Sequence, residues 1–153
     1  MPLTARDIMT STPVTVSPET SVTEASRILL DNRFNGLPVV DAAGTLLGII
    51  CQSDLVMQHK KFHVPSFFFL LDGFIPLQSP KKMEEQLERM SAATVGQAMT
   101  AHPRTIAPDT PLEQIADLMV DDKYHTLPVV ENGKLVGIVG KEDVLRTLVH
   151  RNI

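Results

Sequence analysis

Two aspartates stand at the same place in two similar stretches of the sequence. Asp54 ends the segment GIICQSD, and Asp143 ends the segment GIVGKED. An ionised carboxylate is a strong acceptor that takes charge-assisted hydrogen bonds. Each aspartate is also expected in the first turn of a helix, where negative charge is favourable. The two residues are therefore candidates either for binding a ligand or for capping a helix. Their recurrence does not separate these roles, because a duplicated cap would recur as well.

The two aspartates belong to a longer internal repeat. A shift of 90 positions aligns residues 4–10 with 94–100, and it aligns LPVV at 37–40 with LPVV at 127–130. The shift then drops to 89, because DAAG in the first copy has become ENG in the second. The lost residue falls in a turn, where a change of length is tolerated. Agreement of this extent predicts two copies of one supersecondary unit.

Each copy predicts a strand followed by a helix. The β-branched residues at 14–16 and 104–106 predict short strands, and a helix follows each of them, with a Ser or Thr cap in the first copy. Pro111 suits the first helical position of the second of these helices. The apolar faces of the two helices are formed by Val22, Ala25, Ile28 and Leu29 in the first copy and by Leu112, Ile115, Leu118 and Met119 in the second.

A hairpin and a closing helix complete each copy. LPVVD with LLGIICQ, and LPVVE with KLVGIVG, predict the hairpins, and Asn132 with Gly133 is a strong turn signal. The closing helices are expected to start at Ser53 and Glu142. The strands are apolar on both faces, so each sheet should be covered on both sides. The predicted fold class is α/β (α+β): two β-α-β-β-α repeats packed face to face with pseudo-twofold symmetry.

Length and composition limit the function. At 153 residues the chain can form one domain or two small subdomains, and it contains no apolar run that would span a bilayer. A formal charge of −4 disfavours a broad nucleic-acid surface. The single cysteine, Cys51, cannot form an internal disulfide, and no signal peptide is evident, so we expect a cytoplasmic location. We divide the chain into repeat 1 (1–59), an insert (60–93) and repeat 2 (94–153).

The element order, with LPVV followed by GIICQSD or GIVGKED, resembles the cystathionine-β-synthase (CBS) domain, and the tandem pair resembles the Bateman module. The resemblance covers the chain except roughly residues 60–93. It implies a regulatory module that binds AMP, ADP or ATP, and in some members S-adenosylmethionine or cyclic dinucleotides, in clefts between the repeats. It also implies a homodimer that signals to an effector protein, with no required cofactor.

The resemblance assigns roles to particular residues. The family pattern Gly-h-h-Thr/Ser-x-x-Asp ends in a carboxylate that accepts hydrogen bonds from the ribose hydroxyls, which points to Asp54 and Asp143. At the Thr/Ser position this sequence has Cys51 in the first copy and Gly140 in the second. Both lack the hydroxyl. Cys51 offers only a weak S–H contact, whereas Gly140 allows closer approach of a phosphate or a base.

The resemblance also implies phosphate and adenine contacts. Residues before LP usually bind phosphate, and by residue type the second copy is the better phosphate site. The alternative is that its cations are solvated and its imidazole partly buried. The candidates for phosphate contact are Arg33, Asn35, Gly36, Lys123, His125, Thr126 and Lys141; those for the adenine are Leu37, Pro38, Leu127 and Pro128, with the backbone of Thr15, Val16, Thr105 and Ile106 at its edge.

The insert at 60–93 belongs to neither copy. It holds five of the six phenylalanines, and such an apolar run promotes association when it is exposed. We expect it to extend a dimer contact or cap a ligand cleft. Docking of a separate enzyme or transporter, and contact with a lipid interface, are alternatives. From Ser79 the sequence predicts a charged amphipathic helix.

The sequence gives no positive sign of catalysis. It contains no local nucleophile–base motif, no P-loop and no glycine-rich dinucleotide-binding turn. His59 and His63 are four residues apart, but no third ligand is evident, so we interpret them as exposed histidines rather than a metal site. Two non-enzymatic hypotheses follow. One is a nucleotide sensor, and the other is a ligand-independent dimerisation or partner-docking module that uses the Phe-rich insert.

Overall fold

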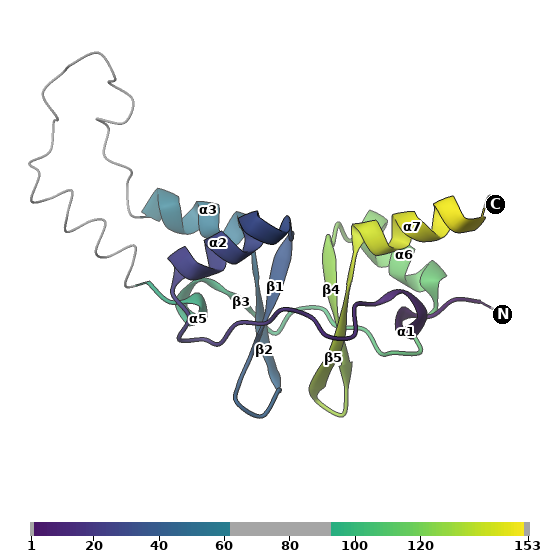
Figure 1. Ribbon diagram of the computed structural model, residues 1–153, viewed down its shortest axis with the longest axis horizontal. Helices are drawn as coiled ribbons and strands as arrows, with labels where there is room; N and C mark the ends of the chain where they lie inside the picture. The colour runs from purple at the N-terminus through teal and green to yellow at the C-terminus, as the bar shows by residue number, and fades with distance from the viewer. Residues whose placement is uncertain (1, 62–92, 152–153) are drawn as a thin grey trace, which may run out of the picture.

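The computed structural model describes residues 2–61 and 93–151, which form two similar halves side by side (Figure 1). The insert phenylalanines, His63 and the helix expected from Ser79 lie outside these residues. The first half contains α2 (Val22–Asn32), β1 (Gly36–Val40), β2 (Leu46–Cys51) and α3 (Gln52–Lys61). The second contains α6 (Leu112–Asp121), β4 (Thr126–Glu131), β5 (Lys134–Gly140) and α7 (Lys141–Arg151). The short elements are α1 (Ala5–Ile8), α5 (Val95–Ala98) and β3 (Thr100–Ala101).

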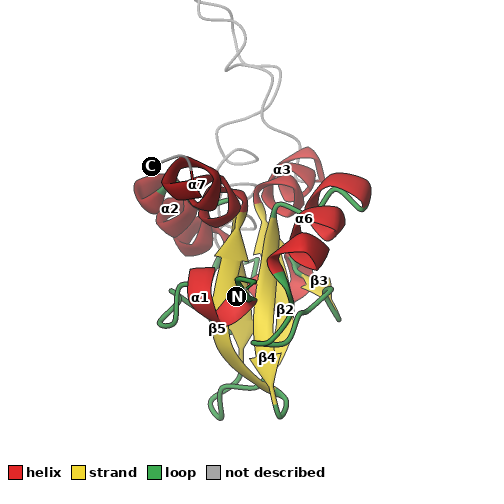
Figure 2. Cartoon of the chain, turned by 90° about the vertical axis from the view of Figure 1, so that its right-hand side faces the viewer, coloured by secondary structure: helices red, strands yellow, loops and turns green. Residues whose placement is uncertain are grey.

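The two halves are related as the repeat predicts. Figure 2 shows α2 and α7 on one side of the strands and α3 and α6 on the other, as a twofold relation between the repeats requires. The two hairpins meet where Thr45 pairs with Lys134. The Lys134 ammonium donates to the Ala43 carbonyl at 3.0 Å and to the Thr45 hydroxyl at 3.1 Å. The mixed α/β fold with face-to-face repeats is confirmed.

Local sequence signals account for the helices. The Ser21 hydroxyl accepts the Glu24 N–H at 3.1 Å, so the predicted cap of α2 is confirmed. Pro111 is the N-cap residue of α6 and not its first helical residue. The closing helices begin at Gln52 and Lys141, one residue before the expected starts.

The hairpins are formed as predicted, with β1 antiparallel to β2 and β4 antiparallel to β5. Asn132 and Gly133 have φ values of 54° and 79°, which a type I′ turn requires at both central positions. In the first hairpin Gly36 lies opposite Cys51, and in the second Thr126 lies opposite Gly140. These two cross-strand pairs matter for the site described below.

The strands predicted at 14–16 and 104–106 are each reduced to a single parallel bridge. Val16 pairs with Val39, and Ile106 pairs with Val129. The Val16 N–H donates to the Pro38 carbonyl at 3.1 Å, and the Val16 carbonyl accepts the Val40 N–H at 3.0 Å. Prolines flank both segments and have no N–H to extend the ladder, so the prediction of three-residue strands at these positions is wrong.

Each half has its own core, and each core contains a residue that comes from the other repeat. Val95 packs with Leu29, Leu37 and Ile50 in the first half. Ala5 packs in the second half, with Ile115, Leu127, Val129 and Val139. The Ala5 N–H donates to the Thr110 carbonyl at 2.9 Å, and the Val95 N–H donates to the Thr20 carbonyl at 2.8 Å. Residues 4–10 therefore pack on repeat 2, and residues 94–101 pack on repeat 1. The predicted boundaries at residues 59 and 94 divide the chain in sequence order and so do not show that each repeat contributes a segment to the other half.

The exchanged segments pass closely over two glycines. A Cβ at Gly48 would lie 2.7 Å from the Thr100 carbonyl oxygen, and one at Gly137 would lie 3.0 Å from the Thr10 carbonyl oxygen. Atoms at the first of these separations overlap. The glycine that opens GIICQSD and GIVGKED thus allows the backbone of the exchanged segment to approach the strand.

Within residues 2–61 and 93–151, no helix has the length and apolar character needed to cross a membrane.

Candidate functional site

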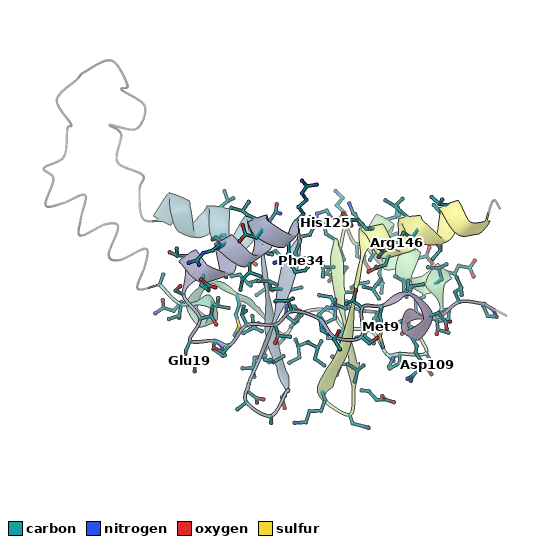
Figure 3. All side chains as sticks on the ribbon, viewed as in Figure 1. Met9, Glu19, Phe34, Asp109, His125 and Arg146 are labelled. Atoms are coloured by element: carbon teal, nitrogen blue, oxygen red, sulfur yellow. The ribbon has the colours of Figure 1, made fainter. Side chains whose placement is uncertain are left out.

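A cleft of about 260 Å³ lies between the two repeats. Its walls come from residues 10–14, from the start of β1, and from the end of β5 with the first turns of α7. Figure 3 labels Phe34 on the first repeat and Arg146 on α7 of the second, two side chains that line this cleft. Eight predicted site residues line it together: Arg33, Asn35, Gly36, Leu37, Thr126, Gly140, Lys141 and Asp143.

Asp143 is the buried acid of this cleft. Its Oδ2 accepts the Gly140 N–H at 2.7 Å, which caps the start of α7. Its Oδ1 accepts a hydrogen bond from the Arg146 guanidinium, one helical turn further along α7. Oδ2 therefore caps the start of α7, and Oδ1 is paired with the Arg146 side chain. The capping and ligand-binding roles do not exclude each other.

Asp54 makes the same cap in the first repeat, but its second oxygen has a different partner. The Cys51 N–H donates to Asp54 Oδ2 at 2.8 Å, and the Thr100 hydroxyl donates to Oδ1 at 3.3 Å. Thr100 belongs to the exchanged segment. Asp54 does not line the cleft described above.

The residue at the Thr/Ser position of the pattern decides how much space each copy leaves. In repeat 1 the Cys51 sulfur lies 3.3 Å from where a Cβ of Gly36 would be, so the thiol fills the space over its cross-strand neighbour. In repeat 2 the nearest atom to a Cβ at Gly140 would be Asp143 Oδ2, at 3.8 Å. The second copy therefore has no thiol at this position, and a Cβ there would meet no atom closer than 3.8 Å.

Cys51 is a neutral thiol at physiological pH. Burial, with a further contribution from the Asp54 carboxylate, raises the pKa of Cys51 from 9.0 to about 11. A thiolate is the nucleophilic form of cysteine, so this residue acts as a small packing side chain.

Lys123 and His125 do not line the Asp143 cleft. Both are exposed, and both line a larger, mainly apolar groove of about 1030 Å³ between α6, α7 and the N-terminal residues. Lys141 borders both cavities. Before LP, residues 33–36 of the other repeat line the Asp143 cleft, and Thr126 of the same repeat lines it as well. The cleft thus combines the acidic motif of one copy with the strand entry of the other.

Most of the predicted adenine contacts lie elsewhere. Val16, Ile106 and Leu127 are buried in the two cores, Pro38 and Pro128 are buried within β1 and β4, and Thr15 and Thr105 are exposed. None of these seven residues lines the cleft; of the predicted adenine contacts only Leu37 does.

Sequence reasoning missed several residues that line the cleft, including Thr12, Val14, Phe34, Glu142 and Arg146. The available signal for Arg146 was its place three residues after Asp143 on a predicted helix, where side chains are neighbours. With Arg33 and Lys141, it brings three cations to a cleft that also holds Glu142 and Asp143.

A metal site finds no support in the described part of the chain. Within it, no three His, Cys, Asp or Glu side chains are grouped so that they could hold an ion.

Comparison with known proteins finds one family model that matches both repeats. The sequence model of the CBS domain matches residues 5–60 and 95–150. The chain is 32% identical over 136 residues to the CBS domain-containing protein CBSX1, chloroplastic, of Arabidopsis thaliana. That alignment covers 86% of this chain but 57% of the relative, so this chain spans less than two thirds of that protein.

Solved structures share the fold over nearly the whole chain. The Arabidopsis thaliana protein CBSX2, solved in complex with AMP, is similar with a TM-score of 0.72 at 29% identity over 98% of both chains. The CBS domain pair of protein MJ0100, solved with 5′-methylthioadenosine and S-adenosyl-L-methionine, has a TM-score of 0.70 at 25% identity over 99% of both chains.

Proposed function

The chain belongs to the CBS domain family, which occurs in it as a tandem pair, and from this premise we propose a regulatory module that binds an adenosine-containing ligand. The ligand class is AMP, ADP or ATP, and the place is the cleft between the repeats. The observation that carries the proposal is the buried Asp143 carboxylate in the wall of an open cleft. A similar CBS pair solved with AMP supports the ligand class.

Each part of the ligand has a counterpart in the cleft. The ribose hydroxyls donate to Asp143, because an ionised acceptor facing two donors forms charge-assisted bonds. The phosphate lies among Arg33, Lys141 and Arg146. The base lies against the apolar wall that includes Val14 and Phe34. Gly140 leaves the space that the ligand enters.

One ligand per chain is the expected stoichiometry. The Cys51 thiol fills the corresponding space in repeat 1, and Thr100 already donates to the second oxygen of Asp54. A ligand there would have to displace both, whereas in repeat 2 it displaces only the Arg146 side chain.

Helix α7 connects the ligand to a dimer surface. Asp143 and Arg146 line the cleft from its first turns, while Leu145, Leu148 and Val149 expose apolar side chains. Further exposed apolar residues lie on α2, α3 and α6: Leu30, Val56, Met57 and Val120. We expect a homodimer through these helices, read by an effector protein. A ligand shifts such an assembly only by its differential affinity for two arrangements.

A thermal-shift screen against AMP, ADP, ATP, S-adenosylmethionine and cyclic dinucleotides tests the proposal. At a hundred times Kd a ligand adds about 2.7 kcal/mol of stability. For a protein of this size the melting temperature should rise by about 5–10 °C. The absence of a rise with every compound at millimolar concentration would contradict ligand sensing.

The exposed apolar helix residues also favour a second function, a ligand-independent assembly module. The hypothesis that the Phe-rich insert docks a partner concerns residues outside those described. The test of assembly therefore uses the exposed apolar residues of the helices. Leu148→Glu places a charge on the exposed face of α7 and should turn a dimer into a monomer, as measured by light scattering.

Ala42→Glu is the matched control. It adds the same charge in the turn between β1 and β2, on the side of the molecule away from the four long helices (Figure 1), and should leave the mass unchanged. An unaltered dimer in Leu148→Glu would show that α7 is not the interface.

A further inference from the structure

The ion pair between Asp143 and Arg146 joins a buried acid to an exposed base. The Asp143 side chain is 9% exposed, and the Arg146 side chain is 63% exposed. The two residues are three apart on α7, and both line the cleft. The only other ion pair in the described residues, Arg27 with Glu24, has the same spacing, but its side chains are 63% and 45% exposed.

The two partners differ in what they lose when the pair breaks. A buried carboxylate oxygen left without a donor is costly, because desolvation is not repaid. An exposed guanidinium loses little, because water replaces the carboxylate. The pair therefore opens easily only when another donor reaches Asp143 Oδ1 at the same time. A ribose hydroxyl is such a donor.

The displaced guanidinium does not leave the site. Because Arg146 lines the same cleft as Asp143, it can turn from the carboxylate to an anion beside it. Guanidinium groups bind phosphate oxygens in a planar, often bidentate geometry. In repeat 1 the corresponding position is Met57, whose side chain can form neither bond.

Resting on the proposed function, we propose that Arg146 is the residue that makes the cleft select phosphate-bearing adenine nucleotides. It exchanges from Asp143 to the ligand phosphate. An uncharged nucleoside must displace Arg146 from Asp143, but it has no phosphate with which the displaced guanidinium could pair. A cationic sulfonium ligand meets Arg33, Lys141 and Arg146 without a neutralising phosphate.

Isothermal titration of AMP and adenosine at fixed ionic strength tests the proposal. In Arg146→Gln, AMP affinity should fall about tenfold, which is the loss of one charge-assisted bond at an exposed site. Adenosine affinity should stay equal or rise, because its competitor for Asp143 is gone. Arg146→Lys keeps the charge and should retain most of the preference for AMP. Arg27→Gln, which breaks the matched pair away from the cleft, should change neither affinity.

The outcomes separate this inference from the proposed function. If the wild-type protein binds AMP and Arg146→Gln lowers both affinities equally, or changes neither, the exchange is refuted while nucleotide binding stands. If the wild-type protein binds neither compound, the proposed function and the exchange both fail.

Discussion

Replacing Asp143 by asparagine is expected to remove most of the ligand-induced rise in melting temperature while the protein stays folded. Asparagine can still accept the Gly140 N–H and caps about as well as aspartate, so most of the cap of α7 is kept. It has no charge to offer the ribose hydroxyls. Loss of a charge-assisted bond costs about 1.5–3 kcal/mol, most of the roughly 2.7 kcal/mol that saturating ligand adds. The measurement is a thermal melt with and without nucleotide at a hundred times the wild-type Kd.

Asp54→Asn is the matched control, because Asp54 makes the same cap with the Cys51 N–H in the other repeat. It should lose similar stability without ligand and keep the full ligand-induced rise. A full rise in Asp143→Asn would show that the ribose assignment is wrong. Loss of the rise in both variants would show that ligand is not confined to the Asp143 cleft.

Gly48→Ala is expected to destabilise the protein by about 1–3 kcal/mol, the usual cost of forcing an extra carbon into a packed site. The new Cβ would lie 2.7 Å from the Thr100 carbonyl oxygen and equally close to the Met99 sulfur. The methionine can move, but the carbonyl is held in the pairing of β2 with β3. Urea denaturation of the variant and the wild type measures the difference in the free energy of unfolding.

Gly140→Ala is the control for this substitution, since it is also at a strand glycine but meets no atom closer than 3.8 Å. Its unfolding free energy should stay within about 0.5 kcal/mol of the wild-type value. If Gly48→Ala were equally harmless, residues 94–101 would not lie against β2, and the exchange between the halves would be wrong.

The sequence by itself determined the elements whose signals are local. The cap at Ser21 and the turn at Asn132 and Gly133 were predictable, because such residues act within a few positions of themselves. The repeat of LPVV and of the glycine-to-aspartate segment predicted two halves of one fold. It also singled out Asp54 and Asp143.

Only the tertiary structure decided which half each segment joins and which aspartate faces an open cleft. Residues 4–10 and 94–100 are alike, so either could pack on either half, and the choice depends on contacts with distant residues such as Thr110 and Thr20. The space beside each aspartate depends on cross-strand and exchanged neighbours, namely Cys51 over Gly36 and Thr100 at Asp54. Shared space between distant residues is a property of packing. A one-dimensional pattern can mark a residue for chemistry, but it cannot state what already fills the space beside it.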